Sequence, residues 1–236
     1  MKFEDYKLNP NWQPDILESY RRIYNEIIND HEYDRHGLMI KEGDTVVDLG
    51  SSIGTFSNYA LENQAEKVIS MEADPETFIY LQKNCNDPRI TCVNGFVCGN
   101  EKTARIISQG NRIHDLCFPG ASMLLQNKQH DFFYDLPRIF QQFNLQKIDF
   151  LKMDVEGMEH NFFIDAPEQL LKKVKQISVE FHVHSILTND MRDFSNMLWI
   201  MSKLSNCGFC FKVGRIHKDT NLYMLYAINE KIGVIL

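Results

Sequence analysis

The feature of this sequence that most constrains its fold is a β-branched run that passes directly into a glycine loop and then into a helical segment. The stretch VVDLGSSIGTFSNYA occupies residues 46–60. Thr45–Val47 predicts a buried strand, Gly50 and Gly54 predict a tight turn, and 55–63 predicts a helix. A strand, a glycine turn and a helix in this order are typical of nucleotide-binding loops in α/β proteins. The stretch therefore predicts both a fold class and a binding site.

Most of the remaining chain continues to alternate between predicted strands and predicted helices. Helices are expected where apolar residues recur at helical spacing, at 14–30, 75–85, 158–173 and 190–206. Strands are expected at 68–71, 90–97, 148–153 and 176–183, followed by a final antiparallel pair at 209–213 and 222–228. This alternation predicts an α/β fold with a mainly parallel sheet and helices on both of its faces.

The stretch 100–146 interrupts the alternation. It begins with a predicted short hairpin near 103–108 and continues as a long loop. A segment of this kind is either a lid or binding loop, or a surface excursion packed on the edge of the sheet. After this loop comes an aromatic patch that either stacks on a sugar ring or packs as core: Phe132, Phe133 and Tyr134.

Length and composition are those of an ordinary globular protein. The 236 residues suit one large domain, 1–236, with an N-terminal helical segment (1–42) and a Rossmann-like core (43–236). The chain is 44% hydrophobic, with a net charge of −7, whereas nucleic-acid binders usually carry a basic patch. No apolar run reaches the roughly 18 residues that a membrane-spanning helix needs. We therefore expect neither a nucleic-acid partner nor a membrane span.

The ends of the chain and its cysteines bear on location. The polar start, MKFEDYKLNPNWQPD, does not resemble a signal peptide, so a cytoplasmic protein is expected. The six cysteines show no repeated pairing, and the C-x-x-C from Cys207 to Cys210 has no second pair. Reduced, buried thiols are therefore favoured over a zinc or redox site.

The glycine loop has two interpretations. Gly50 to Gly54 matches G-x-S-x-G, the turn that carries the nucleophile of many serine hydrolases, with Ser52 as that nucleophile. That interpretation needs an oxyanion loop upstream and a partner acid and histidine downstream, and the sequence singles out none of them. The binding-loop interpretation meets more conditions. Its strand ends near Asp48, and Glu72 ends the next strand, where it could accept hydrogen bonds from the two hydroxyls of a ribose.

The spacing of the loop also indicates which ligand it holds. A dinucleotide loop reads G-x-G-x-x-G, whereas Gly50-Ser-Ser-Ile-Gly54 lacks the close second glycine. Asp48 is expected to place a carboxylate at the loop mouth, which suits a cation better than a phosphate. S-adenosylmethionine carries an ammonium, a sulfonium and a ribose but no phosphate. We therefore expect S-adenosylmethionine as the cofactor and keep NAD as the alternative.

A second group of ionisable residues follows the fourth and fifth main strands. Asp154 and Glu156 come after one strand, and Glu180, His182 and His184 share a face of the next. If these strands are parallel neighbours, the groups gather at the rim where the cofactor binds, and one of them can take up a proton during methyl transfer. We take Asp154, Glu156, Glu180 and His182 as candidate catalytic residues. Asp154, Glu180 and His182 are also hard metal ligands, but their spacing matches no metal signature, so no metal is expected.

Three segments carry a resemblance to a known family: GDTVVDLGSSIGTFS, VISMEADPETFIYLQKN and IDFLKMDVEGME. They resemble the signature blocks of the FkbM-family S-adenosylmethionine-dependent methyltransferases, over roughly 43–182, and the K-x-D-x-E-G block is the most specific of them. The resemblance implies a class I, Rossmann-like fold with a seven-stranded sheet. It also implies, as the usual activity, O-methylation of a hydroxyl on a sugar or polyketide.

The resemblance further implies where site residues lie. Asp154 and Glu156 would face the methyl group and the acceptor. The cofactor would be held by the first loop, by the ends of the next two strands and by the N-terminal segment: Glu32, Asp48, Gly50, Ser51, Ser52, Gly54, Glu72, Ala73, Asn94, Gly95, Phe96 and Asp154.

The sequence thus predicts an S-adenosylmethionine-dependent O-methyltransferase. Its acceptor is expected to be a hydroxyl on a saccharide or a small natural product, with Asp154 or His182 as proton acceptor. The alternative is a non-catalytic protein of the same fold that binds the cofactor or a partner. The gathered acids argue against this alternative, because a binding protein has no need of them.

Overall fold

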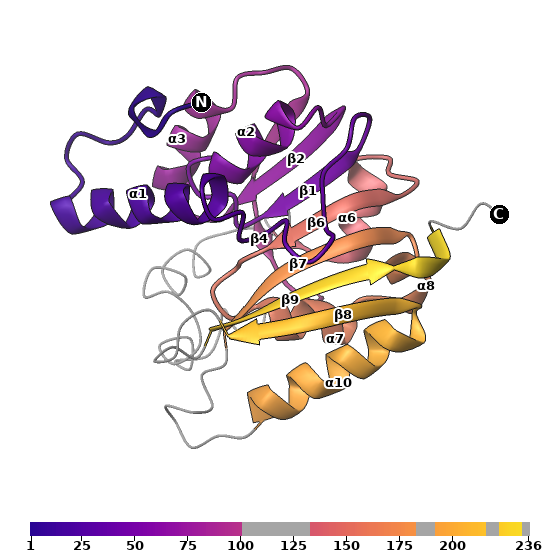
Figure 1. Cartoon of the computed structure of the whole chain (residues 1–236). Helices are drawn as coiled ribbons and strands as arrows, with labels where there is room; N and C mark the ends of the chain where they lie inside the picture. The colour runs from indigo at the N-terminus through magenta and orange to yellow at the C-terminus, as the bar shows by residue number, and fades with distance from the viewer. Residues whose placement is uncertain (101–132, 183–191, 216–221, 233–236) are drawn as a thin grey trace.

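A computed structural model of the chain describes residues 1–100, 133–182, 192–215 and 222–232. Its centre is a seven-stranded sheet in the order β3-β2-β1-β6-β7-β9-β8 (Figure 1). β9 pairs antiparallel with β7 and β8, and all other neighbouring pairs are parallel. The strands are β1 Thr45–Leu49, β2 Lys67–Glu72, β3 Ile90–Asn94, β6 Ile148–Met153, β7 Val174–His182, β8 Phe209–Arg215 and β9 Leu222–Asn229. The predicted seven-stranded, mostly parallel sheet is confirmed.

Helices cover both faces of the sheet, as predicted (Figure 1). Strand residues alternate between two apolar cores: Val46 lies in the core that includes Phe56, and Val47 lies in the core that includes Phe162. The first core is covered by α1 Pro14–Ile28, α2 Thr55–Glu62 and α3 Pro75–Asn84, and the second by α6 Leu136–Gln142, α7 Glu159–Asp165, α8 Glu168–Leu171 and α10 Arg192–Asn206. The short helices η1 Phe3–Asp5 and η4 Glu230–Ile232 lie near the two ends.

The strand order determines where a ligand can bind. β1 and β6 are neighbours in the middle of the sheet, and the chain runs outward from them in opposite directions, to β2 on one side and β7 on the other. The loops that leave the carboxyl ends of β1 and β6 therefore meet where the strand order reverses. In open α/β sheets this is the usual position of a ligand crevice.

Two predicted elements are shorter than expected. The strand at 90–97 is broken at Gly95, and its second part, β4 Phe96–Val97, leaves the main sheet to pair with β5 Phe133–Tyr134. A Cβ on Gly95 would lie 2.6 Å from the ring of Tyr134, so only glycine allows this close approach. The helix at 158–173 is also wrong as a single element. It divides into α7 and α8 because Ala166 precedes a proline and takes an extended ψ of 126°.

The stretch 100–146 contains more structure than the sequence predicted. α6 begins there, with the Asp135 carboxylate accepting a hydrogen bond from the Arg138 amide at 2.8 Å and a proline in its first turn. Phe133 and Tyr134 are buried, so of the two interpretations of the aromatic patch the core one is correct for them. Phe132 and the predicted hairpin at 103–108 lie outside the described residues.

Two further predictions concern membranes and thiols. Among the helices that the structure describes, none has the length and apolar character to cross a membrane. The described cysteines are free thiols, and Cys207 is buried whereas Cys210 is exposed. The C-x-x-C pair therefore forms no disulfide.

Candidate active site

The loop after β1 is shaped by three residues with left-handed backbone conformations. Gly50, Ser52 and Gly54 have φ angles of 77°, 51° and 94°. The amides of Gly50 and Ser51 both donate to the carbonyl oxygen of Met71, which ties the loop to the end of β2. A Cβ on Gly50 would lie 1.7 Å from the carbonyl oxygen of Asp154. The glycine is therefore needed to bring the loop against the turn that follows β6.

Glu72 lies at the end of β2 and faces this loop. Its Oε2 accepts a hydrogen bond from the Ser52 amide at 2.9 Å, and its Oε1 accepts one from the Asp74 amide at 2.7 Å. Burial raises the pKa of Glu72 to about 7, although these two N–H groups favour the charged form. Each carboxylate oxygen keeps a second lone pair, so the side chain can still accept hydrogen bonds from a ribose.

Asp48 does not occupy the position expected for it. Its side chain is fully buried, with Oδ2 accepting a hydrogen bond from Ser57 Oγ at 2.7 Å and Oδ1 3.3 Å from Lys152 Nζ. The prediction of a carboxylate at the loop mouth is therefore wrong. Asp48 alternates with Val47 and Leu49 along β1, so it faces the α2 side of the sheet rather than the loop. Its contact with the loop is indirect, because Lys152 also donates to the Gly50 carbonyl oxygen at 2.6 Å.

Two other predicted cofactor residues, Ser51 and Asn94, support the same loop. Ser51 Oγ donates to the Asp48 carbonyl oxygen at 2.8 Å. The side-chain amide of Asn94 donates to the carbonyl oxygens of Glu72 and Ala73, at 2.9 and 3.1 Å. Phe96 is buried and packs edge-to-face on Phe133. Asn94 therefore fixes the turn after β2, beside the carboxylate of Glu72.

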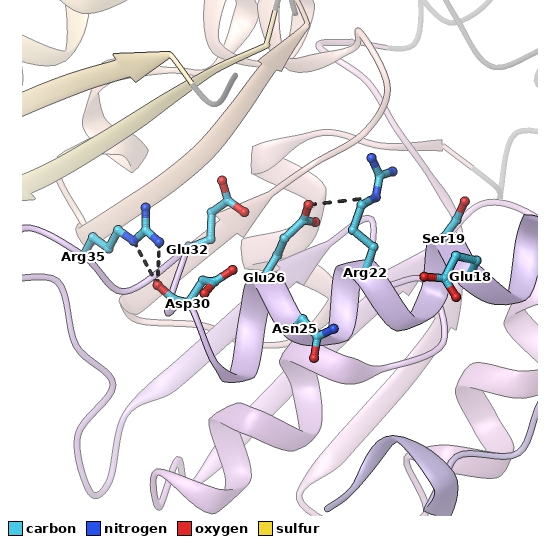
Figure 2. Close-up of a pocket in the computed structure, with 8 residues that line it drawn as sticks. All are labelled: Glu18, Ser19, Arg22, Asn25, Glu26, Asp30, Glu32 and Arg35. Carbon is cyan, nitrogen blue, oxygen red and sulfur yellow. Dashed lines mark hydrogen bonds and ion pairs between the residues drawn. The ribbon is translucent and has the colours of Figure 1, made fainter. Parts of the chain in front are cut away.

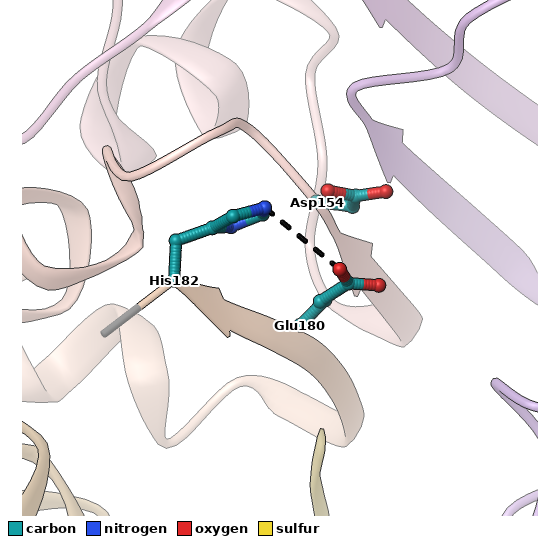
Figure 3. A group of neighbouring side chains, drawn as sticks. All are labelled: Asp154, Glu180 and His182. Atoms are coloured by element: carbon teal, nitrogen blue, oxygen red, sulfur yellow. Dashed lines mark ion pairs between the residues drawn. The ribbon is translucent and has the colours of Figure 1, made fainter. Parts of the chain in front are cut away.

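The acids predicted to gather at the rim are brought together. Asp154, Glu180 and His182 each offer a nitrogen or oxygen atom within 4.8 Å of the others, and Figure 3 shows the imidazole turned toward Glu180. The hydroxyl of Tyr33 lies 3.2 Å from Asp154 Oδ2 and 3.4 Å from Glu180 Oε2, and can donate to either. Burial, followed by the charge of Asp154, raises the pKa of Glu180 to about 8. His184 lies outside the described residues.

His182 lies between carboxylates on both sides of its ring. Nδ1 is 3.1 Å from Glu159 Oε1, and Nε2 is 3.3 Å from Glu156 Oε2. Burial alone would lower the pKa of His182. The negative charges of Glu159, Asp154 and Glu156 have the larger effect and raise this pKa to about 10. The imidazole is therefore protonated at neutral pH.

The same protonation bears on metal binding. Asp154, Glu180 and His182 are hard donors at a spacing that a divalent cation could bridge. A protonated imidazole has no free lone pair to offer such an ion. The arrangement fits an ion-pair cluster better than a metal centre, and the absence of a metal stays a prediction.

Glu32 connects the acid cluster to a surface pocket. The pocket has a volume of about 650 Å³ and runs along α1 (Figure 2). Its lining is polar, and half of its residues are acids: Glu18, Ser19, Arg22, Asn25, Glu26, Asp30, Glu32 and Arg35. The charge of Glu32 contributes to the raised pKa of both Tyr33 and Glu180, so the carboxylate is close to both. Glu32 thus lies where the pocket meets the cluster.

Sequence reasoning missed three buried residues of this site. Tyr33 and Lys152 are separated from their partners by long stretches of chain, which no local pattern bridges. Glu159 had a detectable signal, because it is the first residue of α7 and acids are common in the first turn of a helix. Lys152 belongs to the K-x-D-x-E-G block, but its position on the strand gave no reason to expect a buried ammonium.

The comparison with protein families gives one match over most of the chain. The family model described as "Methyltransferase FkbM domain" matches residues 48–211. A curated relative, 31-O-demethyl-FK506 methyltransferase FkbM from Streptomyces tacrolimicus, is 38% identical over 69 residues. That match covers 29% of this chain and only 26% of the relative. The resemblance stated from the three sequence segments is confirmed.

Solved structures agree on the fold. The Methanococcus jannaschii fibrillarin pre-rRNA processing protein has a TM-score of 0.54 at 16% identity, covering 98% of this chain and 85% of that one. The Streptococcus mutans protein SMU.1697c, solved in complex with SAH, has a TM-score of 0.50 at 8% identity, covering 86% of this chain and 96% of that one. At such identities the likeness shows the fold alone.

Proposed function

The chain belongs to the FkbM methyltransferase family, and from that premise we propose that it methylates a hydroxyl of a saccharide or small natural-product acceptor, using S-adenosylmethionine. The observation that carries the proposal is the contact between the glycine loop and the turn after β6. The Asp154 amide donates to the Leu49 carbonyl oxygen at 3.0 Å, and Gly50 packs against the Asp154 carbonyl. A ligand in the loop would therefore lie beside the turn that carries Asp154.

The residues present fit S-adenosylmethionine. Glu72 offers acceptor positions for the two ribose hydroxyls, and Gly50 lets the loop lie directly against the turn after β6. The carboxylates of Asp154 and Glu180 suit the positive charge of an ammonium and a sulfonium. When bound, the cofactor supplies an electrophilic methyl carbon to the acceptor oxygen.

Asp154 is the proposed proton acceptor. A hydroxyl that gains a methyl group loses its proton, and a carboxylate within hydrogen-bond distance can accept it. His182 is the less suitable base, because its raised pKa of about 10 keeps it protonated at neutral pH. The Tyr33 hydroxyl lies between Asp154 and Glu180 and can donate a hydrogen bond to either of them.

The pocket along α1 supports a hydroxylated acceptor. Its carboxylate and guanidinium groups can hydrogen-bond to the hydroxyls of a sugar or polyol, and its four acids outnumber its two arginines. An excess of negative charge is unfavourable for a phosphate backbone. This charge supports the expectation that the acceptor is not a nucleic acid.

The test is a methyl-transfer assay with S-adenosylmethionine carrying a labelled methyl group. The acceptor panel contains methyl glycosides, a polyhydroxylated macrolide and total RNA, and each product is analysed for the methylated atom. We expect label on a hydroxyl of a small acceptor. Label on RNA, or on nitrogen, would contradict the proposed acceptor class.

The rival function is a non-catalytic cofactor-binding protein of the same fold. It predicts cofactor binding without label on any acceptor. Asp154→Asn separates the two once an acceptor is found, because it should lower turnover far more than cofactor affinity. Asp87→Asn, at a partly exposed acid paired with Arg89, is the control and should leave turnover unchanged.

A further inference from the structure

We propose that Glu159 is a positioning residue of the active site, which holds the imidazole of His182 in one orientation with Nε2–H facing the carboxylates of Glu156 and Glu180. The inference rests on the proposed function, since it assigns His182 a role in that site. It concerns a residue that touches neither cofactor nor acceptor and that acts only through its neighbours.

Glu159 is the first residue of α7 and is fully buried. A single oxygen, Oε1, lies at hydrogen-bond distance from three donors: the amides of Val155 and Gly157, at 3.0 and 3.2 Å, and Nδ1 of His182, at 3.1 Å. A buried carboxylate needs such partners to remain ionised. Burial would raise the pKa of Glu159, but His182 and these hydrogen bonds lower it overall, so the side chain stays charged.

The two amide contacts link Glu159 to the turn that carries the proposed base. Glu156 and Gly157 have φ angles of 54° and 104°, so the turn contains two successive left-handed residues. The glutamate bonds to the amides on either side of Glu156 and thereby stabilises this turn. The same carboxylate thus holds both the turn with Asp154 and the ring of His182.

The third contact fixes the protonation of the ring. With Nδ1–H donating to Glu159, the other nitrogen is directed at Glu156 Oε2, at 3.3 Å, and at Glu180 Oε1, at 3.8 Å. A carboxylate on Nδ1 makes the ring more basic and sets its orientation. His182 is therefore a fixed cation among the acids, and its charge lowers the pKa of Glu156 and Glu180, although burial leaves both pKa values raised overall.

Charged and titratable groups approach His182 from every element packed against it. Glu159 lies on α7, Asp154 and Glu156 on the turn after β6, and Glu180 on β7 itself. Four further groups act on these acids: Glu32, Tyr33, Lys152 and His160. Among these acids, Glu159 is the one that is fully buried and bonds to Nδ1. Its removal should therefore change the pKa and the orientation of the His182 ring most.

The test follows the ring nitrogens of His182 by long-range ¹⁵N–¹H NMR during a pH titration. His182→Gln assigns the signals. In the wild-type protein at about pH 8 we expect both ring nitrogens to be protonated, because a free histidine with a pKa of about 6.5 would be neutral there. A neutral His182 ring in the wild-type protein would overturn the proposal, whatever any variant does.

Glu159→Gln keeps the shape of the side chain and removes its charge. The pKa of His182 should fall by about one unit or more. Asp149→Asn is the matched control, at a buried acid that bonds to the Thr45 amide on the same sheet, and it should leave the His182 titration unchanged. An unchanged titration in Glu159→Gln, or an equal shift in both variants, would overturn the proposal.

Cofactor affinity measured on the same samples keeps this test separate from the proposed function. If the wild-type protein does not bind S-adenosylmethionine, the proposed activity is contradicted, and the His182 titration can still be interpreted. Normal binding together with an unchanged titration in Glu159→Gln would contradict only the role of Glu159.

Discussion

At the scale of single residues, Glu72 determines how the cofactor site responds to pH. Its pKa of about 7 places the change of charge near neutrality. An ionised carboxylate accepts both ribose hydroxyls, whereas a protonated one must give up an acceptor position. We expect S-adenosylmethionine to bind about tenfold more tightly near pH 8 than near pH 6, as calorimetry at each pH would measure.

Glu72→Gln tests the cause of that dependence. The amide cannot ionise in this range, so the pH dependence should disappear, and the affinity near pH 8 should fall by about 1.5–3 kcal/mol for the lost charged hydrogen bonds. Glu42→Gln, at an exposed glutamate before β1, is the control. A pH dependence that persists in Glu72→Gln would assign the titration to another group.

Residues also differ in how far the sequence could place them. Asp154, Glu180 and His182 were predicted because strand residues two apart share a face and parallel strands end at one rim. Tyr33 was not predicted, because its role depends on contacts between distant parts of the fold. Asp48 was predicted with its carboxylate at the loop mouth, yet strand alternation buries that carboxylate.

At the scale of elements, the glycine loop depends on its approach to the turn after β6. Gly50→Ala should lower the free energy of unfolding by about 1–3 kcal/mol because of the left-handed φ. The loss should be larger still, because the added Cβ would meet the Asp154 carbonyl oxygen at 1.7 Å. Gly43 also has a left-handed φ, of 82°, but nothing lies near an added Cβ, so Gly43→Ala should lose only the free energy that corresponds to the backbone strain. Urea unfolding of both variants measures the difference.

Gly214→Ala completes this series. Nothing lies within 4 Å of an added Cβ there, and the residue is in β8, far from the loop in the chain. Its free energy of unfolding should stay within about 0.5 kcal/mol of wild type. If Gly50→Ala and Gly43→Ala lose the same free energy of unfolding, the loop does not need its close approach to Asp154.

The elements that the sequence predicted poorly share a physical cause. The strand and helix at 90–97 and 158–173 look continuous in local pattern, but each is broken at one residue. The strand is broken at Gly95, where the ring of Tyr134 occupies the space that a side chain would fill. The helix is broken at Ala166, because a proline follows it. The proline was visible in the sequence, whereas the contact with Tyr134 was not.

At the scale of the whole molecule, a buried polar row crosses four strands of the sheet. Ser70, Asp48, Lys152 and Ser178 are successive register partners on β2, β1, β6 and β7, and all four are buried. Lys152 is the cation of the row and also reaches the Gly50 carbonyl oxygen. The row joins the cofactor loop to the strands that carry the acid cluster.

This row predicts a strong coupling between Lys152 and Asp48. Lys152→Met leaves the Asp48 carboxylate buried without its cation and should lower the free energy of unfolding by about 3–5 kcal/mol. Adding Asp48→Asn should recover part of that loss, since the amide needs no counter-charge. Urea unfolding of the single and double variants measures the coupling, and strictly additive losses would show that the two residues do not act as a pair.

The most direct test of the account is calorimetric titration of the purified protein with S-adenosylmethionine and, separately, with NAD. The site geometry predicts micromolar binding of S-adenosylmethionine, no binding of NAD, and a clear loss of affinity in Glu72→Gln. Binding of NAD alone, or binding of neither ligand, would contradict the assignment of the loop from Gly50 to Gly54 as the cofactor site of a methyltransferase.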